Sequence, residues 1–301
     1  MTLESRAVRV VEVGPRDGLQ NEPTAVPTLT KVALIDRLTS TGLRTVEATS
    51  FVNPTAVPQL ADGADVYQAI SRDDAVTYPV LVPNMRGYEA AQAVGATSIA
   101  VFTAASESFN QRNIGASIAE SIERFRPVVE AAQTDGVHVR GYVSCAFGCP
   151  FEGPISPDAV MDVSARLLDL GIADLSIGDT IGVAVPTDVA PVCEPLLNLA
   201  DVGELALHLH DTRGTALSNV QAGLELGIRT FDASIAGLGG CPFAPGATGN
   251  LATEDLVWFL HRQGYDTGVD LSALIAVSQW ISTSLDRTTS GHVAGARVWP
   301  W

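Results

Sequence analysis

Lysine is nearly absent from this chain of 301 residues, in which Lys31 is the one lysine among 18 basic residues. The apolar side chains from Leu29 to Leu38 recur with helical spacing, so Lys31 is expected on an early amphipathic helix. An aldolase that works through an imine needs a desolvated lysine inside its pocket. Because the face of an early helix is a poor place for such a lysine, imine chemistry is not expected here.

Cysteine is also scarce, and Cys145, Cys149, Cys193 and Cys241 form no Cys-x-x-Cys pair. Their spacing does not match a zinc ribbon, so we expect reduced thiols. No run of about 18 apolar residues suggests a membrane span. The first ten residues include Glu4 and lack the apolar core of a signal peptide. We therefore expect a soluble, cytoplasmic protein without a membrane partner.

Positive charge is limited as well, because 34 acidic residues face 18 basic ones and the formal net charge is −16. Such a surface repels nucleic acid and anionic membranes, so neither is an expected partner. An anionic ligand must instead be bound by a local group of arginines, which make up all the basic residues other than Lys31.

Short β-branched runs alternate with helical patterns along the chain without a break in composition. Strands are expected near residues 8–13, 44–48, 77–82, 98–102, 137–143, 174–177, 204–210 and 230–235. Helices are expected near 28–42, 58–71, 86–95, 117–135, 156–171, 186–200, 213–227 and 252–263. Eight βα units in order predict a TIM (β/α)₈ barrel rather than an open doubly wound sheet.

The expected domain organisation is a single catalytic domain over residues 1–301, with the barrel over about 8–265. A helix near 270–286 and a tail follow the eighth unit, so that residues of about 266–301 form a C-terminal helical extension. This extension could cap the barrel or contact a second subunit.

Two histidines lie two residues apart in the predicted strand 204–210. The leucines at 205, 207 and 209 alternate with them, which places His208 and His210 on the same face. Two imidazoles on one face could bind a divalent metal ion. A buried pair held by hydrogen bonds is the alternative.

Further polar side chains fall where the predicted strands end. They are Glu12, Arg16, Asp17, Gln20, Glu47, Arg140, Ser144, Asp179 and Asn250. Each alone could be a turn, cap or surface residue, but barrel active sites gather at this end, and a polar cluster is costly unless it binds something.

Five glycines and two prolines in residues 237–249, around Cys241, predict a mobile lid rather than an irregular connection.

Six segments carry a family resemblance: residues 14–22 (GPRDGLQNE), 46–52 (VEATSFV), 140–145 (RGYVSC), 178–182 (GDTIG), 208–212 (HLHDT) and 237–255. In register from about residue 8 to 286, the chain resembles hydroxymethylglutaryl-CoA lyase. That family belongs to a group of metal-dependent TIM barrels that make or break carbon–carbon bonds next to carbonyl groups. The resemblance implies an acyl-CoA substrate and a homodimer.

The resemblance also implies roles for individual residues. The implied metal ligands are Asp17, His208, His210 and Asn250. The implied catalytic residues are Arg16 on the thioester carbonyl and Cys241 as acid and base, with support from Glu12, Glu47, Asp179, Glu254 and Asp255. We expect substrate contacts from Gln20, Arg140 and Ser144. Such a ligand set suits Mg²⁺ or Mn²⁺, although ligand type alone would also allow Zn²⁺ or Fe²⁺.

The implied activity is cleavage of 3-hydroxy-3-methylglutaryl-CoA (HMG-CoA) to acetyl-CoA and acetoacetate, in the breakdown of leucine or related acyl-CoA compounds. Arg213 and Thr215 stand where the family has tyrosine and glutamine, and Pro23 stands where a lysine is frequent. The substituent at the substrate's 3-position could therefore differ. The same cleavage of citramalyl-CoA or a 3-hydroxy-3-alkylglutaryl-CoA stays open, as does a barrel that binds an acyl-CoA without turnover.

Overall fold

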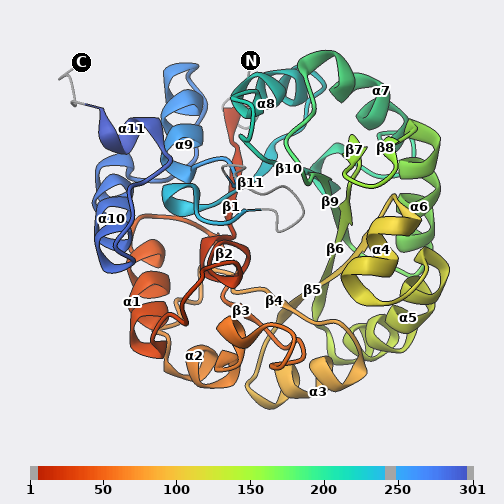
Figure 1. Cartoon of the computed structure of the whole chain (residues 1–301), viewed down its shortest axis with the longest axis horizontal. Helices are drawn as coiled ribbons and strands as arrows, with labels where there is room; N and C mark the ends of the chain where they lie inside the picture. Colours follow the sequence, from red (N-terminus) through yellow and green to blue (C-terminus); the bar gives the residue numbers. More distant parts are fainter. Residues whose placement is uncertain (1–5, 241–248, 297–301) are drawn as a thin grey trace.

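The computed structural model describes residues 6–240 and 249–296, and its main sheet is a curled array of parallel strands (Figure 1). In chain order these strands are β1 (Arg9–Glu12), β2 (Thr45–Val46), β3 (Thr49–Ser50), β4 (Val80–Leu81), β5 (Ser98–Ala104), β6 (His138–Ser144), β9 (Asp174–Asp179), β10 (Leu205–Leu209) and β11 (Thr230–Ala233). Their order in the sheet is β2-β1-β11-β10-β9-β6-β5-β4-β3.

The second predicted strand closes the barrel in two pieces. Its first piece, β2, pairs with β1, and its second piece, β3, pairs with β4. Between the two pieces, the backbone N–H of Glu47 donates to the Glu12 carbonyl at 2.8 Å, and that of Ala48 donates to the Pro79 carbonyl at 2.9 Å. The eight predicted strands therefore form a closed ring, which confirms the predicted TIM barrel.

Helices surround the strands on the outside of the ring (Figure 1). They are α1 (Thr28–Thr39), α2 (Gly63–Ala69), α3 (Met85–Ala93), α5 (Ile118–Asp135), α6 (Pro157–Asp169), α7 (Pro186–Leu196), α8 (Ala216–Glu225) and α9 (Thr253–Arg262). Each matches one predicted helix. The α5 helix begins with a capping box between Ser117 and Glu120. Apolar side chains buried between strands and helices form the core.

Several short elements were not predicted. They are the π-helical turn η2 (Gly14–Gly18), the 3₁₀ turns η3 (Pro58–Leu60), η4 (Val202–Glu204) and η5 (Ile235–Gly237), the helix α4 (Glu107–Ile114), and the hairpin of β7 (Gly148–Cys149) and β8 (Gly153–Pro154). Helix α4 is mostly polar, and the hairpin strands have two residues each. Segments this short or polar lack the periodic apolar pattern on which the prediction depended.

The C-terminal extension contains α10 (Leu271–Ser284) and α11 (His292–Gly295). Helix α10 packs against α1 and α9, and α11 packs against α9, so the predicted helix near 270–286 is confirmed. Figure 1 shows α10, in blue, beside α1, in red-orange. In residues 6–240 and 249–296, no helix has the length and apolarity needed to cross a bilayer.

Lys31 lies on α1, as the helical pattern predicted. It is buried, and its Nζ atom lies 2.6 Å from Asp62 Oδ1. It also donates to the Gln59 carbonyl, so the ammonium group joins α1 to the segment before α2. Lys31 is not among the residues that line the cavity described below.

Candidate active site

The turn after β1 is built on a buried glutamate. Glu12 accepts hydrogen bonds from the backbone N–H of Gly14 at 2.7 Å and of Ile235 at 2.9 Å, and from Thr253 Oγ1 at 2.6 Å. Burial is the largest influence on this carboxyl group and raises its pKa to about 7. Glu12 therefore lies beneath the turn and ties β1 to η5 and α9.

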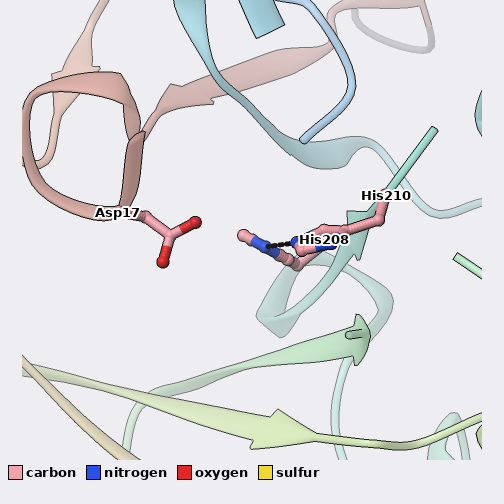
Figure 2. Close-up of side chains that lie close together, drawn as sticks. All are labelled: Asp17, His208 and His210. Atoms are coloured by element: carbon pink, nitrogen blue, oxygen red, sulfur yellow. Dashed lines mark hydrogen bonds between the residues drawn. The ribbon is translucent and has the colours of Figure 1, made fainter. Parts of the chain in front are cut away.

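Asp17 and two histidines meet at the carboxyl end of the barrel (Figure 2). His208 on β10 and His210 directly after its end point to the same side, as predicted, with their Nε2 atoms 3.3 Å apart. Asp17 faces them from η2. One ligand atom from each of the three side chains lies within 4.8 Å of the others, so this group could hold a metal ion.

Asn250 lies beside this group and contacts Asp17. Its Nδ2 atom donates to Asp17 Oδ2 at 2.7 Å and to the Leu238 carbonyl at 3.0 Å, which uses both amide hydrogens. Its Oδ1 atom is buried and has no hydrogen-bond partner among the described residues. An unsatisfied buried acceptor costs roughly 1–3 kcal/mol, so this oxygen fits a place where a cation binds.

His208 is supported from behind by Asp232 on β11. The strand register places the two residues opposite each other, and Asp232 Oδ2 lies 3.2 Å from His208 Nδ1. The same carboxylate accepts from Ser176 Oγ at 2.7 Å and from Arg140 Nη2 at 2.7 Å. Because a carboxylate accepts the proton of Nδ1, the lone pair of Nε2 is left to face the metal-binding group.

Charges around the histidines set their protonation. Burial would lower the pKa of His208, but the hydrogen bond and charge of Asp232 raise it above the ordinary value of 6.5. Burial lowers the pKa of His210 to about 4, and His208 adds to that effect. Burial would raise the pKa of Asp232, but Arg140 and His208 hold it at about 2. At neutral pH Asp232 is ionised and His210 is neutral, and neutral imidazole is the form that binds a metal.

Arg16 is held between two carboxylates. Its Nη1 atom lies 2.9 Å from Asp17 Oδ1 and its Nη2 atom lies 2.9 Å from Glu47 Oε2. The Tyr142 hydroxyl donates to the same Glu47 oxygen at 3.1 Å, and the Tyr142 ring lies 5.5 Å below the guanidinium. Burial would lower the pKa of Arg16, but Glu47 and Asp17 raise it further, so its charge is permanent.

The pKa values of the two carboxyl groups that pair with Arg16 shift in opposite directions. Burial would raise the pKa of Asp17, but Arg16 and His208 hold it below its usual value. Burial raises the pKa of Glu47 in spite of Arg16. Asp17 is therefore ionised and available to a cation, while Glu47 serves to fix the guanidinium.

Arg140 and Asp179 are among the predicted site residues that do not line the cavity described below. Arg140 is buried and paired with Asp232, and it does not line the cavity. Asp179 accepts from the backbone N–H of Val183 at 2.9 Å and of Ala184 at 3.0 Å, and it does not line the cavity either. These positions suit support of His208 by Arg140, and of the loop after β9 by Asp179.

An open cavity of about 430 Å³ joins these groups. Its polar lining includes Arg16, Asp17, Gln20, Ser144, His208 and His210, and its apolar lining includes Val52, Leu81, Phe102, Phe109 and Phe125. Gln20 and Ser144 are thus on the cavity surface, where a substrate could reach them. A cavity lined by both polar and apolar side chains suits a ligand with a polar head and an aliphatic arm. Cys241 and the rest of the predicted lid at 241–248 lie outside the described residues.

Comparison with known proteins matches residues 7–281 to the HMGL-like family. The chain belongs to the HMGL-like family. The mitochondrial hydroxymethylglutaryl-CoA lyase of Gallus gallus is 50% identical over 289 residues, which are 96% of this chain and 97% of that protein. The cytoplasmic 3-hydroxy-3-methylglutaryl-CoA lyase of Danio rerio is 50% identical over 96% of this chain and 86% of its own length. The resemblance inferred from the sequence motifs is confirmed.

A solved HMG-CoA lyase from Acinetobacter baumannii, in complex with coenzyme A and 3-methylmalate, has a TM-score of 0.95 to this HMGL-like chain. It is 41% identical, and the match covers 100% of both chains. The barrel and its C-terminal extension are therefore shared along the whole length.

Sequence motifs did not identify Asp232, Ser176 or Tyr142 as part of the HMGL-like site. Asp232 carried one available signal, because it is a carboxylate inside the predicted strand 230–235 and follows the apolar Phe231. Tyr142 carried another, because it alternates with Arg140 and Ser144 on one face of β6. Neither signal identifies the hydrogen-bond or ion-pair partner of the residue, and that partner determines the role of each residue.

Proposed function

We propose that this HMGL-like protein is a carbon–carbon lyase that cleaves HMG-CoA to acetyl-CoA and acetoacetate. The observation that carries the proposal is that Arg16 contacts Asp17 beside His208 and His210, and that all four side chains line one cavity. Family membership supports it, because relatives named HMG-CoA lyase are about half identical along nearly their whole length. The catalytic unit is proposed to be one domain over residues 1–301.

Four side chains are proposed to hold a divalent metal ion: Asp17, His208, His210 and Asn250. They supply one carboxylate oxygen, two imidazole nitrogens and one amide oxygen, and the unpartnered Oδ1 of Asn250 fits this role. We propose Mg²⁺ or Mn²⁺, because oxygen ligands predominate once substrate oxygens are included. Such an ion, when bound, makes a substrate hydroxyl group more acidic.

Arg16 is proposed to bind the thioester carbonyl oxygen of the substrate. Negative charge develops on this oxygen as the carbon–carbon bond breaks and the acetyl-CoA fragment leaves as an enolate. Glu47 and Tyr142 fix the guanidinium in advance, and a preorganised donor of this kind contributes about 3–4 kcal/mol. Cys241 is proposed as both acid and base: it accepts the proton of the substrate hydroxyl group, and it donates a proton to the enolate carbon to give acetyl-CoA.

The remaining predicted residues are proposed to position or contact the substrate. Gln20 and Ser144 line the cavity and are proposed to contact the acyl group. Glu12 supports the turn of Arg16 from below, and Asp179 supports the loop after β9. Arg140 is proposed to act through Asp232 rather than on the substrate.

The test is a substrate panel with metal-depleted and metal-restored protein. HMG-CoA, citramalyl-CoA and 3-hydroxy-3-ethylglutaryl-CoA are each supplied with and without Mg²⁺ or Mn²⁺, and both products are measured. We expect equal amounts of acetyl-CoA and acetoacetate from HMG-CoA, only when metal is present. Faster cleavage of another compound would replace HMG-CoA as the substrate, and no cleavage of any compound would reject the lyase.

We further propose a homodimer that acts in the cytoplasm, in the breakdown of leucine or related acyl-CoA compounds. Membership in a family with cytoplasmic as well as mitochondrial relatives supports the compartment, and the resemblance to the lyases supports the dimer. Light scattering of the purified protein tests the dimer, and fractionation of the source cell tests the compartment. A monomeric mass would remove the dimer from the proposal.

A further inference from the structure

The C-terminal extension lies outside the eight βα units, and the proposed function gives it no role. Residues 287–293, here called the C-terminal clasp, return from α10 to the barrel. Arg287 Nη1 lies 2.6 Å from Glu22 Oε1 at one end, and at the other end Val293 N donates to Asp255 Oδ1 at 2.7 Å. Between these anchors the clasp lies against η5.

The η5 turn has a backbone conformation that needs support. Ala236 and Gly237 have φ values of 57° and 61°, in the left-handed region that a residue with a side chain rarely adopts. The N–H of Ala236 donates to Glu254 Oε2 at 3.1 Å. Its carbonyl accepts from the backbone N–H of Ser290 at 3.2 Å and lies 3.1 Å from Ser290 Oγ. The strained residue is thus held on one side by α9 and on the other by the clasp.

The clasp also packs directly on Glu254. This carboxylate is fully buried, and Oε1 accepts from Ser278 Oγ at 2.6 Å and lies 3.4 Å from Thr289 Oγ1. A Cβ atom at Gly291 would lie 2.5 Å from Glu254 Oε1, so any larger residue here would force the Glu254 carboxylate to move. The clasp, α9 and η5 therefore form one packed unit.

The next residue after η5 connects this unit to the metal-binding group. The Leu238 carbonyl accepts from Asn250 Nδ2, the bond that leaves Asn250 Oδ1 free. The Leu238 side chain packs on Gly18, where an added Cβ would lie 2.7 Å from Leu238 Cβ. Gly18 ends the turn that carries Asp17. A shift of η5 would therefore move two of the four proposed metal ligands.

We propose that Ser290 is a positioning residue for the metal site. By holding the Ala236 carbonyl, it fixes η5, and through Leu238 it sets the orientation of Asn250 and the place of Asp17. Ser290 bonds to neither ligand in the structure. This inference rests on the metal site of the proposed function, so its readout is metal binding rather than turnover.

The experiment titrates metal-free full-length protein with Mn²⁺ alone, followed by electron paramagnetic resonance. Ser290→Ala should weaken Mn²⁺ binding about three- to tenfold, because supporting residues of metal sites have effects of this order or larger. Thr289→Val, which removes the other hydroxyl within 3.3 Å of the Ala236 carbonyl, should act in the same direction. The matched control is Ser284→Ala, because Ser284 is exposed on α10 and its Oγ donates only to the Trp280 carbonyl of the same helix among the described residues, so this variant should bind like the unaltered protein.

If the C-terminal clasp only stabilised the fold, the experiment would give a different pattern. The melting temperature of the metal-free protein would fall in Ser290→Ala, while Mn²⁺ affinity stayed within a factor of about two of the Ser284→Ala control. That result would overturn the positioning role. Failure of the unaltered protein to bind Mn²⁺ would overturn the metal site itself, and the positioning role with it. If Ser290→Ala does not fold, the same comparison is made with Thr289→Val.

Discussion

Asp232 and His208 face each other across paired parallel strands, with the carboxylate 3.2 Å from the imidazole Nδ1 atom. Asp232 is fully buried and has no place on the cavity surface, yet it determines which imidazole nitrogen is available at the site. Its second oxygen is held by Arg140 at 2.7 Å. The proposed metal site thus depends on a buried ion pair beneath it.

Asp232→Asn should weaken Mn²⁺ binding about 10- to 100-fold, because the amide no longer fixes the His208 tautomer. It should also destabilise the fold by about 3–5 kcal/mol, because Arg140 is left buried without its carboxylate. Mn²⁺ titration and urea unfolding measure the two effects. The double variant Arg140→Gln/Asp232→Asn removes the stranded charge, so stability should largely return while affinity stays low. If affinity returned with stability, the tautomer explanation would fail.

Metal affinity should depend on pH through His208. Asp232 raises its pKa above 6.5 against the effect of burial, so a proton begins to compete with the metal at a higher pH than it would at an unperturbed histidine. Affinity should be constant above the raised pKa and fall about tenfold per pH unit below it. His210, with a pKa of about 4, adds to the loss only in stronger acid. Isothermal titration with Mn²⁺ across this range checks the profile, and a flat profile through weakly acidic pH would contradict it.

Arg16 and Asp17 are adjacent, but their substitution should change different properties of the enzyme. Arg16→Gln should leave Mn²⁺ binding nearly unchanged and reduce kcat about 100-fold or more, since it removes charge aimed at the developing enolate. Asp17→Asn should mainly reduce metal affinity, because a ligand charge is lost. Steady-state kinetics at saturating metal, paired with Mn²⁺ titration, separates the two. An effect of Arg16→Gln on KM alone would mean that Arg16 only binds the ground state.

Cys241 should be the reactive thiol. The other three cysteines, Cys145, Cys149 and Cys193, are buried, and burial raises the pKa of Cys193 to about 12. Iodoacetamide should therefore inactivate the enzyme by modifying Cys241, with protection by bound substrate. Cys241→Ser should lower kcat about 100-fold or more with metal content unchanged. Peptide mapping of inactive protein that found Cys241 unmodified, or wild-type turnover by the serine variant, would send the search for the proton donor to Glu12, Glu47 and Asp179.

Much of the barrel could be predicted from the sequence because its signals are local. Each predicted strand and helix of the eight βα units lies where the apolar period placed it, and the alternation of residues 205–210 correctly put His208 and His210 on one face. The interruption of the second strand at Glu47 and Ala48 could not be predicted in this way. It arises because the two halves of that strand pair with different neighbours.

By itself, the sequence determined the period of each element, the side of the strand on which the histidines lie, and the family. Only the tertiary structure decided the partners of the buried charges. Arg140 was expected to reach the substrate but pairs with Asp232, which is 92 residues away, and Asn250 donates to Asp17, 233 residues away. Side-chain period follows from backbone geometry within a few residues. The partner of a buried charge depends instead on strand register and barrel closure, which bring together residues that no local pattern relates.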